Sequence, residues 1–328
     1  MARANAAYYA SRDPFADFTT SPEITQVFGE VLGLWAAVTW AAMGRPDPVL
    51  LVECGPGRGT LMADALRAAA QAAPDFRAAL RVHLVEASPR LRAVQAVAVP
   101  GAAWHDGLEA VPGGPVLLLA NEFLDALPVR QFVRRGAGWV ERFVEGGGFV
   151  EHALTGGDGA GPPPHPDPLP EGEGEGDVLE LNEAALGVAV AVAARVVRDG
   201  GAALFLDYGP ERSAPGDSLQ ALRGGRPAHP LEAPGEADLT AHVDFAALAR
   251  AARGAGAAVH GPVPQGPFLA RLGLFQRTGR LARTQPPARA AALVQAAQRL
   301  AEPDRMGRLF KALCIAHPAL PVPAGFEP

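Results

Sequence analysis

The fold of this chain is decided by the stretch Leu50-Leu51-Val52-Glu53-Cys54-Gly55-Pro56-Gly57-Arg58-Gly59-Thr60-Leu61. The apolar run at 49–52 predicts a buried parallel strand that ends in an acid, and residues 61–73 predict a helix with Thr60 as its N-cap. Between them, glycines stand at alternate positions. Strand, glycine turn and helix form the unit that holds nucleotides in open α/β sheets, because glycine lets the backbone approach a ligand and the helix N-terminus attracts its negative part.

The spacing of the glycines distinguishes between kinds of nucleotide turn. A dinucleotide fingerprint reads G-x-G-x-x-G, and a phosphate-binding P-loop requires G-K-[ST]. This turn reads E-x-G-x-G-x-G and contains no lysine. It resembles motif I of the class I S-adenosylmethionine (SAM)-dependent methyltransferases, in which the turn packs against the methionine and ribose of a ligand without phosphate. Taken alone, the motif also fits an ordinary strand-to-helix turn.

The composition indicates a globular protein that is not a general binder of nucleic acid or membrane surfaces. The 328 residues, 48% of them hydrophobic, can bury a large core. The net charge is -6, the pI is about 5.8, and no basic stripe is evident. The longest apolar runs are shorter than the ~18 residues that span a bilayer, and the N-terminus lacks a signal-peptide core. The cysteines and histidines show no metal-binding spacing. We expect a cytoplasmic protein without a metal.

Two more strands are predicted to end in acids that can hold an adenosine. Residues 81–86 form a strand that ends in Glu86, which can accept hydrogen bonds from both ribose hydroxyls. Residues 102–104 form a short strand, and Asp106 after it can accept from the adenine amine or serve only as a turn residue. We assign cofactor binding to Glu53, Gly55, Gly57, Gly59, Glu86, Asp106 and Asn121.

The fourth and fifth predicted strands end in a second polar group. Residues 115–120 lead into Asn121-Glu122-Phe123-Leu124-Asp125, and residues 203–206 lead into Asp207. In open α/β sheets the ligand lies beyond the carboxyl ends of the strands, so this group would present the acceptor atom beside the cofactor. A helix cap would explain Asn121 but leaves Glu122 and Asp125 without a purpose.

The chain divides into five predicted parts. They are an N-terminal loop and helix covering the cofactor site (1–45), a Rossmann-like cofactor-binding half (46–128), an antiparallel meander (129–154), a low-complexity disordered insert (155–177), and the remainder of the sheet with helical additions (178–328). Within the first part, residues 1–28 predict an ordered loop, and a helix is predicted from Pro22 to Met43. Residues 305–315 predict a final strand.

Blocks along nearly the whole chain, except 155–177, resemble one family. They are Tyr8-Tyr9, Asp17-Phe18-Thr19-Thr20-Ser21-Pro22-Glu23-Ile24, Phe28-Gly29-Glu30, Glu53-Cys54-Gly55-Pro56-Gly57-Arg58-Gly59-Thr60, Leu84-Val85-Glu86-Ala87-Ser88-Pro89, Asn121-Glu122-Phe123-Leu124-Asp125-Ala126-Leu127-Pro128, Asp207-Tyr208-Gly209, Asp238-Leu239-Thr240-Ala241-His242-Val243-Asp244-Phe245, Gln265-Gly266-Pro267-Phe268-Leu269 and Met306-Gly307-Arg308-Leu309-Phe310-Lys311. Together they resemble the MidA-like SAM-dependent methyltransferases, also called the DUF185 family. The block at 121–128 is its most specific part.

The resemblance implies a fold, a cofactor and a substrate. The fold is α/β, a class I methyltransferase with a Rossmann-like, mostly parallel sheet, helices on both faces and inserted antiparallel and helical elements. The donor is SAM. The family's mitochondrial member is a complex I assembly factor and protein arginine methyltransferase, which implies an acceptor arginine on the 49-kDa-type subunit of respiratory complex I. Relatives carry a longer segment before Tyr8 and a longer loop before Asp17. If that region covers the SAM site, affinity or turnover would be reduced here.

An arginine acceptor dictates what the catalytic residues must do. Its guanidinium keeps its proton and is a poor nucleophile, so carboxylates that grip it would orient it and draw charge from the attacking nitrogen. We expect Glu122 and Asp125 in that role, with Asp207 as a second candidate. Two alternatives remain open at this point: a SAM-binding assembly protein without catalysis, and a nicotinamide-dependent oxidoreductase, against which the glycine spacing counts.

Overall fold

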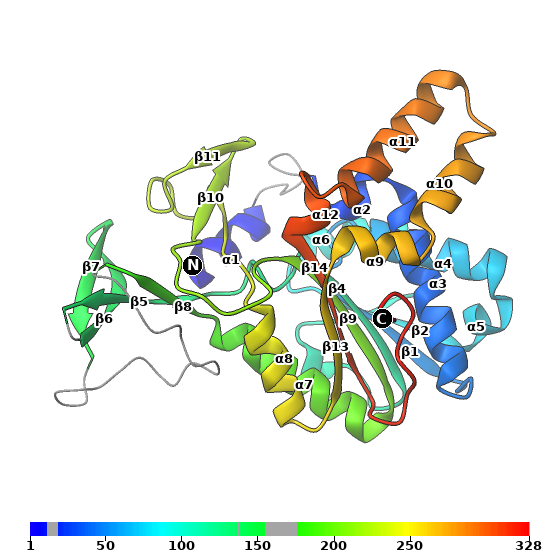
Figure 1. Ribbon diagram of the computed structural model, residues 1–328, viewed down its shortest axis with the longest axis horizontal. Coiled ribbons are helices and arrows are strands. Elements are labelled where there is room, and N and C mark those ends of the chain that lie inside the picture. Colours follow the sequence, from blue (N-terminus) through cyan, green and yellow to red (C-terminus); the bar gives the residue numbers. More distant parts are fainter. Residues whose placement is uncertain (12–18, 137, 155–175, 328) are drawn as a thin grey trace.

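A seven-stranded sheet lies at the centre of the protein (Figure 1). The computed structural model describes residues 1–11, 19–136, 138–154 and 176–327. The strand order is β13–β14–β9–β4–β1–β2–β3, with β14 antiparallel to both neighbours and the other pairs parallel. The strands are β1 (Val49–Cys54), β2 (Leu80–Val85), β3 (Ala103–His105), β4 (Val116–Asn121), β9 (Gly201–Tyr208), β13 (Ala258–Pro264) and β14 (Phe310–Ala316).

Helices cover both faces of this sheet, which explains why its central strands are apolar throughout. Leu51 faces the core shared with the first helix layer, whereas Leu50 and Val52 face the core shared with the second. The first layer holds α3 (Gln26–Ala42), α4 (Thr60–Ala72), α5 (Pro74–Ala79), α6 (Pro89–Ala98), α9 (Gln265–Arg271), α10 (Leu274–Ala282) and α11 (Pro287–Ala301), and the second holds α7 (Glu183–Asp199) and α8 (Phe245–Gly254). The predicted class I methyltransferase fold is confirmed.

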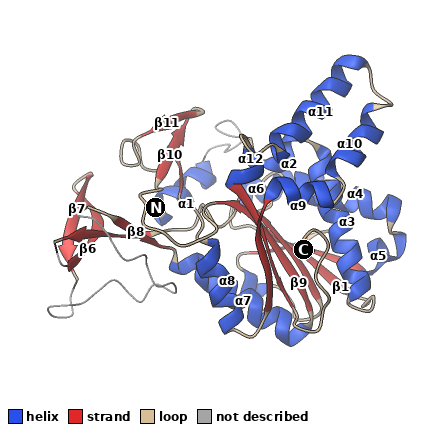
Figure 2. Cartoon of the chain, viewed as in Figure 1, coloured by secondary structure: helices blue, strands red, loops and turns tan. Residues whose placement is uncertain are grey.

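Two small antiparallel sheets lie at one side of the main sheet (Figure 2). One contains β5 (Arg130–Arg135), β6 (Gly138–Glu145), β7 (Gly148–Ala153) and β8 (Val178–Leu181), and the other contains β10 (Gln220–Arg223), β11 (Arg226–Ala228) and β12 (Asp238–Thr240). The first includes the meander predicted over 129–154. Residues 155–175 of the predicted insert lie outside the described residues. No helix of the described part is long and apolar enough to cross a membrane.

The N-terminal region differs from the predicted loop. Ala2–Ser11 forms helix α1, because its residues pack on β12 and the Asn5 side chain bonds to the Leu239 backbone. The helix predicted from Pro22 to Met43 is two helices, α2 (Ser21–Ile24) and α3. Thr25 is extended between them, and its side chain accepts a hydrogen bond from the Val27 N–H.

The C-terminal third holds elements that the sequence pattern did not predict. The final strand begins only at Phe310, because Met306–Leu309 forms the short helix α12. Strand β13 and the helices α10 and α11 were likewise not predicted. Before helix α4, the N-cap is Gly59 in the left-handed region (φ 81°), rather than the predicted Thr60. Helix α4 therefore begins one residue earlier than predicted, at Thr60.

Helices α3 and α4 approach so closely that glycine is required between them. A Cβ on Gly33 would lie 2.6 Å from the Ala65 Cα, and one on Gly29 would lie 2.7 Å from the Asp64 Cβ. The close contact buries the face of α3 that carries Phe28, against the sheet.

We predict that Gly33→Ala destabilises the protein although alanine favours helix. Helix propensity alone would add about 1 kcal/mol, but the overpacked contact should cost more, for a net loss of about 1–3 kcal/mol in unfolding free energy. Gly279→Ala in α10 is the matched control, because a Cβ there meets nothing within 4 Å. Urea denaturation of both variants checks this, and a Gly33→Ala protein as stable as the control contradicts it.

Candidate functional site

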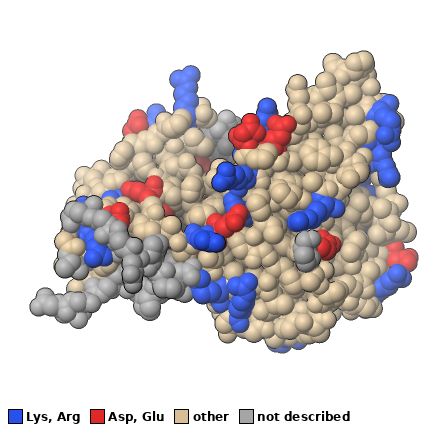
Figure 3. Space-filling model, in the orientation of Figure 1, with Lys and Arg blue, Asp and Glu red and all other residues tan. Residues whose placement is uncertain are grey.

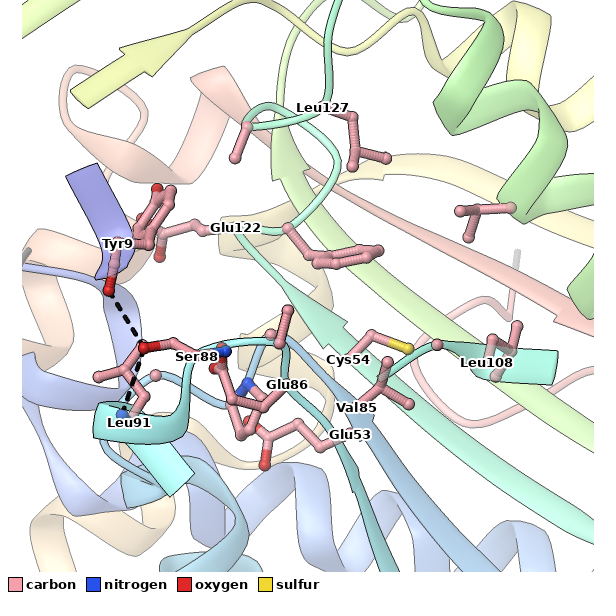
Figure 4. A pocket seen from close by; sticks show the side chains of 18 of the residues that line it. Tyr9, Glu53, Cys54, Val85, Glu86, Ser88, Leu91, Leu108, Glu122 and Leu127 are labelled. Carbon is pink, nitrogen blue, oxygen red and sulfur yellow. Dashed lines mark hydrogen bonds between the residues drawn. The ribbon is translucent and has the colours of Figure 1, made fainter. Parts of the chain in front are cut away.

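A cavity of about 1110 Å³ lies at the carboxyl ends of β1, β2 and β4. Figure 4 shows three carboxylates around it: Glu53 from the end of β1, Glu86 from the end of β2 and Glu122 from the end of β4. The wall is completed by α1, the start of α2, and one side of α7. Of the residues predicted to form the site, the cavity wall contains Glu53, Gly55, Gly57, Glu86, Asp106, Asn121 and Glu122, and does not contain Gly59, Asp125 or Asp207.

The glycine turn is shaped by what packs behind it. Gly55 has φ 65°, and a Cβ there would lie 2.9 Å from the Phe123 ring. Gly59 also has positive φ, and a Cβ there would press on Val99 at 3.3 Å. Gly55 therefore lets the loop after β4 close over the turn, whereas Gly59 lets α4 begin against α6. Both glycines are needed, although only Gly55 faces the cavity.

Glu53 is a buried acid with an unused oxygen. Its side chain is enclosed, the Met62 N–H donates to it, and its Oε2 has no hydrogen-bond partner among the described residues. Burial raises the pKa of Glu53 to about 8. A buried carboxylate oxygen without a partner is costly unless a ligand satisfies it. A cationic group in the cavity would supply the missing donor.

Glu86 lies in a network that ties it to the glycine turn. Its Oε1 accepts from the Ser88 N–H at 2.8 Å, and its Oε2 accepts from the Gln95 Nε2 at 3.2 Å. The same Gln95 amide donates to the Gly57 carbonyl at 2.8 Å, while its oxygen accepts from Trp104 Nε1. Burial raises the pKa of the Glu86 carboxyl. Gln95, fully buried and not predicted as a site residue, thus fixes the turn and the acid relative to one another.

Asp106 is positioned differently from the prediction. It contributes to the cavity rim, but its carboxylate is 90% exposed and pairs with Arg92 at 2.6 Å. The short connection from β3 to β4 contains only the 3₁₀ helix Leu108–Ala110, so nothing turns Asp106 inward. These contacts favour a rim position over the predicted contact with an adenine amine.

Glu122 is held in a strained position beside the cavity. Its φ is 49°, which non-glycine residues seldom adopt, and its N–H donates to the Leu206 carbonyl at 2.9 Å. Its Oε1 accepts from the Ser21 N–H at 2.8 Å and from the Asn121 amide at 3.0 Å. Both of these hydrogen bonds use Oε1. Burial raises the pKa of Glu122. The Asn121 Oδ1 is also buried without a partner among the described residues.

Asp125 and Asp207 lie behind the wall instead of on it. The Asp207 Oδ2 accepts from the backbone N–H groups of Phe123, Leu124 and Asp125 at 3.1, 2.9 and 3.3 Å. Asp207 is 1% exposed and Asp125 is 5% exposed. Burial raises the pKa of each above the usual aspartate range. These contacts favour a positioning role for Asp207, which shapes the loop that carries Glu122, over direct contact with a substrate.

Helix α1 supplies site residues that the sequence analysis did not identify. Tyr9 lines the cavity, and its hydroxyl donates to Asp238 at 2.8 Å. Its carbonyl accepts from the Ser88 hydroxyl at 3.1 Å, as drawn in Figure 4. Asn5 lines the cavity too, and its amide donates to the Ala126 carbonyl at 2.9 Å. The aromatic pair at positions 8 and 9 was the only local signal for this role.

The opposite wall of the cavity is apolar. Leu108, Phe123, Leu127 and Val188 line it, and Gly187 in α7 adds no side chain there. A flat heteroaromatic ring fits such a wall, since the face of the ring and the apolar side chains bury each other.

The strand order, the E-x-G-x-G-x-G turn and the acids at the strand ends define a class I SAM-dependent methyltransferase. The chain belongs to the Methyltransf_28 family of S-adenosyl-L-methionine-dependent methyltransferases, whose model matches residues 31–263. The turn, Glu86 and the group at 121–125 all fall inside that match. The cofactor predicted from the sequence is therefore confirmed, and a nicotinamide-dependent oxidoreductase is excluded.

Curated relatives give a more particular likeness. A Danio rerio protein named "Protein arginine methyltransferase NDUFAF7, mitochondrial" is 34% identical, over 95% of this chain and 80% of the relative. The Homo sapiens protein of that name is 34% identical, over 92% and 75%. A solved structure of a COG1565 superfamily member from Burkholderia thailandensis bound to S-adenosyl-homocysteine has a TM-score of 0.73 and 26% identity, over 95% of this chain and 80% of that one.

The cytoplasmic location expected from the sequence is wrong on this comparison. The curated relatives are named as mitochondrial proteins and not as cytoplasmic ones. The expectation rested on the short apolar runs and on the lack of a signal-peptide core. Neither feature distinguishes one aqueous compartment from another.

We predict that S-adenosylhomocysteine (SAH) stabilises the protein and that Glu86 carries much of its affinity. At 100-fold excess over its dissociation constant, SAH should add about 2.7 kcal/mol in thermal melts, whereas NAD should add nothing. Glu86→Gln should weaken SAH binding about tenfold, because a charged acceptor is lost. Asp106→Asn is the control and should change it by less than about twofold, since that carboxylate is exposed. Equal losses in the two variants would contradict this distinction.

We also predict that Asp207→Asn destabilises the fold through the loop after β4. The amide offers one weaker acceptor in place of a carboxylate that receives several backbone N–H groups. The unfolding free energy should fall by about 2–4 kcal/mol. Asp217→Asn is the surface control, because the Asp217 side chain is 47% exposed, and it should cost less than about 1 kcal/mol. Urea denaturation that finds the two variants alike would refute the positioning role.

Proposed function

We propose that this chain is a SAM-dependent protein arginine N-methyltransferase, in which Glu122 binds the acceptor guanidinium. The observation that carries the proposal is the Glu122 carboxylate at the cavity wall, held by Ser21 and Asn121 with one oxygen directed to neither donor. The relatives named protein arginine methyltransferases support the acceptor type.

The residues present fit the cofactor. Glu53 would face its ammonium, since the buried Oε2 lacks a donor. Glu86 would accept from the ribose hydroxyls, and Leu108 and Val188 would pack on the adenine ring. When bound, SAM supplies a methyl group on a sulfonium. The role of the cavity is alignment, because positioning two reactants can lower a barrier by several kcal/mol.

Glu122 would do two things for a guanidinium. Its carboxylate would fix the plane of the group through a charge-assisted hydrogen bond and localise the positive charge away from the attacking nitrogen. Methyl transfer from a sulfonium to a guanidinium releases one proton, because the sulfonium becomes a neutral thioether while the methylated guanidinium keeps a single positive charge. The raised pKa of Glu122 makes its carboxylate a better acceptor for that proton than an exposed glutamate.

The acceptor protein follows from the family resemblance. We propose an arginine on the 49-kDa-type subunit of respiratory complex I, as the resemblance to the family's mitochondrial member implies. Incubation of that recombinant subunit with the enzyme and isotopically labelled SAM should place label on an arginine, read by mass spectrometry. A subunit that stays unlabelled while another protein is labelled would redirect the acceptor assignment.

We predict that Glu122→Gln abolishes methyl transfer while SAH binding persists. Loss of the charged partner should reduce kcat about 100-fold or more. Glu109→Gln is the matched control, since Glu109 is an exposed carboxylate at the same cavity. In the wild-type enzyme, kcat/KM should rise with pH through a pKa above the usual glutamate range, because Glu122 must be ionised to grip the acceptor. Full activity of Glu122→Gln would refute its role.

A further inference from the structure

The charge of the chain is unevenly distributed along its sequence. No Asp or Glu occurs between Asp244 and Glu302, whereas residues 265–301 carry Arg271, Arg277, Arg280, Arg283, Arg289 and Arg299. Since the whole chain carries -6 and this segment +6, the other residues together carry -12. The overall net charge is negative and does not reveal this concentration of arginine, which is why no basic stripe was identified from the composition.

All of these arginines except Arg271, which ends α9, lie on a hairpin formed by helices α10 and α11, which projects from the main body (Figure 1). Arg277 is used internally, because it pairs with the buried Glu30 at 2.7 Å. Arg280, Arg283 and Arg289 are exposed, and none has an acidic partner within the described ranges. Figure 3 shows blue side chains along the outer edge of the hairpin and no red ones there. We call Arg280, Arg283 and Arg289 the hairpin arginines.

The base of the hairpin lies beside the acceptor end of the cavity. The pair between Arg277 and Glu30 fixes α10 on α3, and α3 follows directly on α2, whose Ser21 N–H bonds to Glu122. Arg299 of α11 lies near enough for its charge to lower the pKa of Glu122, against the larger effect of burial. A protein that places an arginine side chain at Glu122 would therefore lie beside the base of the hairpin.

We propose that the α10–α11 hairpin is a docking surface for an acidic segment of the protein substrate, through the hairpin arginines. The inference rests on the proposed function, because it assigns the partner to the same site. Charge complementarity identifies the occupant. A cationic surface without acids, on an otherwise acidic protein, attracts an acidic partner and repels cationic ones.

A protein segment fits this surface better than nucleic acid or a lipid headgroup layer. Both of the latter are extended anions that would also meet the acidic remainder of the chain, which carries -12. The hairpin also exposes Phe275 by 46% and Val294 by 44%. Arginine beside exposed aromatic side chains is the composition that protein–protein interfaces favour.

The position of the hairpin arginines predicts which kinetic constants depend on them. The hairpin arginines do not line the cavity, so they should affect the capture of the substrate and leave the chemical step unchanged. Exposed charges of this kind act on association and are screened by salt. Loss of the hairpin arginines should therefore raise KM and leave kcat unchanged.

The test uses two labelled peptides that differ only in charge. Each carries one central arginine, flanked by glutamates in the first peptide and by glutamines in the second. Fluorescence anisotropy should show that the wild-type chain binds the glutamate peptide about tenfold more tightly, with the difference lost at high salt. The triple variant R280E/R283E/R289E should lose the preference. The triple variant R280Q/R283Q/R289Q, which removes the charges without reversing them and so disturbs folding less, should lose most of it.

Control variants separate the hairpin from the net charge. R212E/R226E/R253E changes the net charge by the same amount at exposed arginines elsewhere and should keep the preference. Three results would overturn the proposal: no preference in the wild type, an equal loss in the control triple, or tighter hairpin-dependent binding of phosphatidylserine vesicles or DNA than of the glutamate peptide.

Failure of the proposed function is distinguishable from failure of this inference. Methyl transfer to the glutamine peptide and SAH binding should be the same in the wild type and in the hairpin triple. If no variant methylates either peptide, the proposed function fails, while the anisotropy still decides whether the hairpin selects acidic segments. If both peptides are methylated with equal KM by the wild type, the docking proposal fails and the function stands.

Discussion

The carboxylate of Asp207, at the end of β9, is the contact on which the site depends. It accepts from three consecutive backbone N–H groups at 123–125, and so it turns the chain sharply where β4 ends. That turn places Glu122 in the left-handed region, with its side chain toward Ser21 and the cavity. A carboxylate can receive several donors at once, and a buried one is tolerated only when it does. Glu122, which we propose binds the acceptor, is thus placed by Asp207, which lies behind the cavity wall.

The site is also built from three distant parts of the chain that meet at one sheet edge. Parallel pairing of β1 with β2 and β4 brings Glu53, Glu86 and Glu122 to that edge, and α1 closes it through Asn5 and Tyr9. The hairpin α10–α11 joins this assembly through the buried pair of Arg277 with Glu30. The cavity and the proposed partner surface therefore share one base in the fold, in which an acid-lined cavity lies next to a cationic hairpin.

The sequence pattern predicted those helices and strands whose own residues are distinctive. The strand at the start of the glycine turn was recognisable because its residues are apolar throughout, as a strand buried on both faces requires. Glu86 and Glu122 were identified because they follow predicted buried strands, at the sheet edge where ligands bind. Helix α1, β13 and the hairpin were not predicted, because in an Ala-rich and Gly-rich chain the helical and loop residues look alike and tertiary contacts decide. Gln95 had no signal, since its partners, the Gly57 carbonyl and the side chains of Glu86 and Trp104, come from separate segments.

The sequence by itself determined the fold class, the cofactor and the acids that end the strands, because short runs of residues encode parallel strands and glycine turns. Only the tertiary structure decided which of those acids face the cavity. Glu122 lies on the wall, Asp207 and Asp125 lie behind it, and Asp106 is drawn outward by Arg92. The direction of a side chain depends on the donors around it, and those donors come from segments that sequence distance does not bring together.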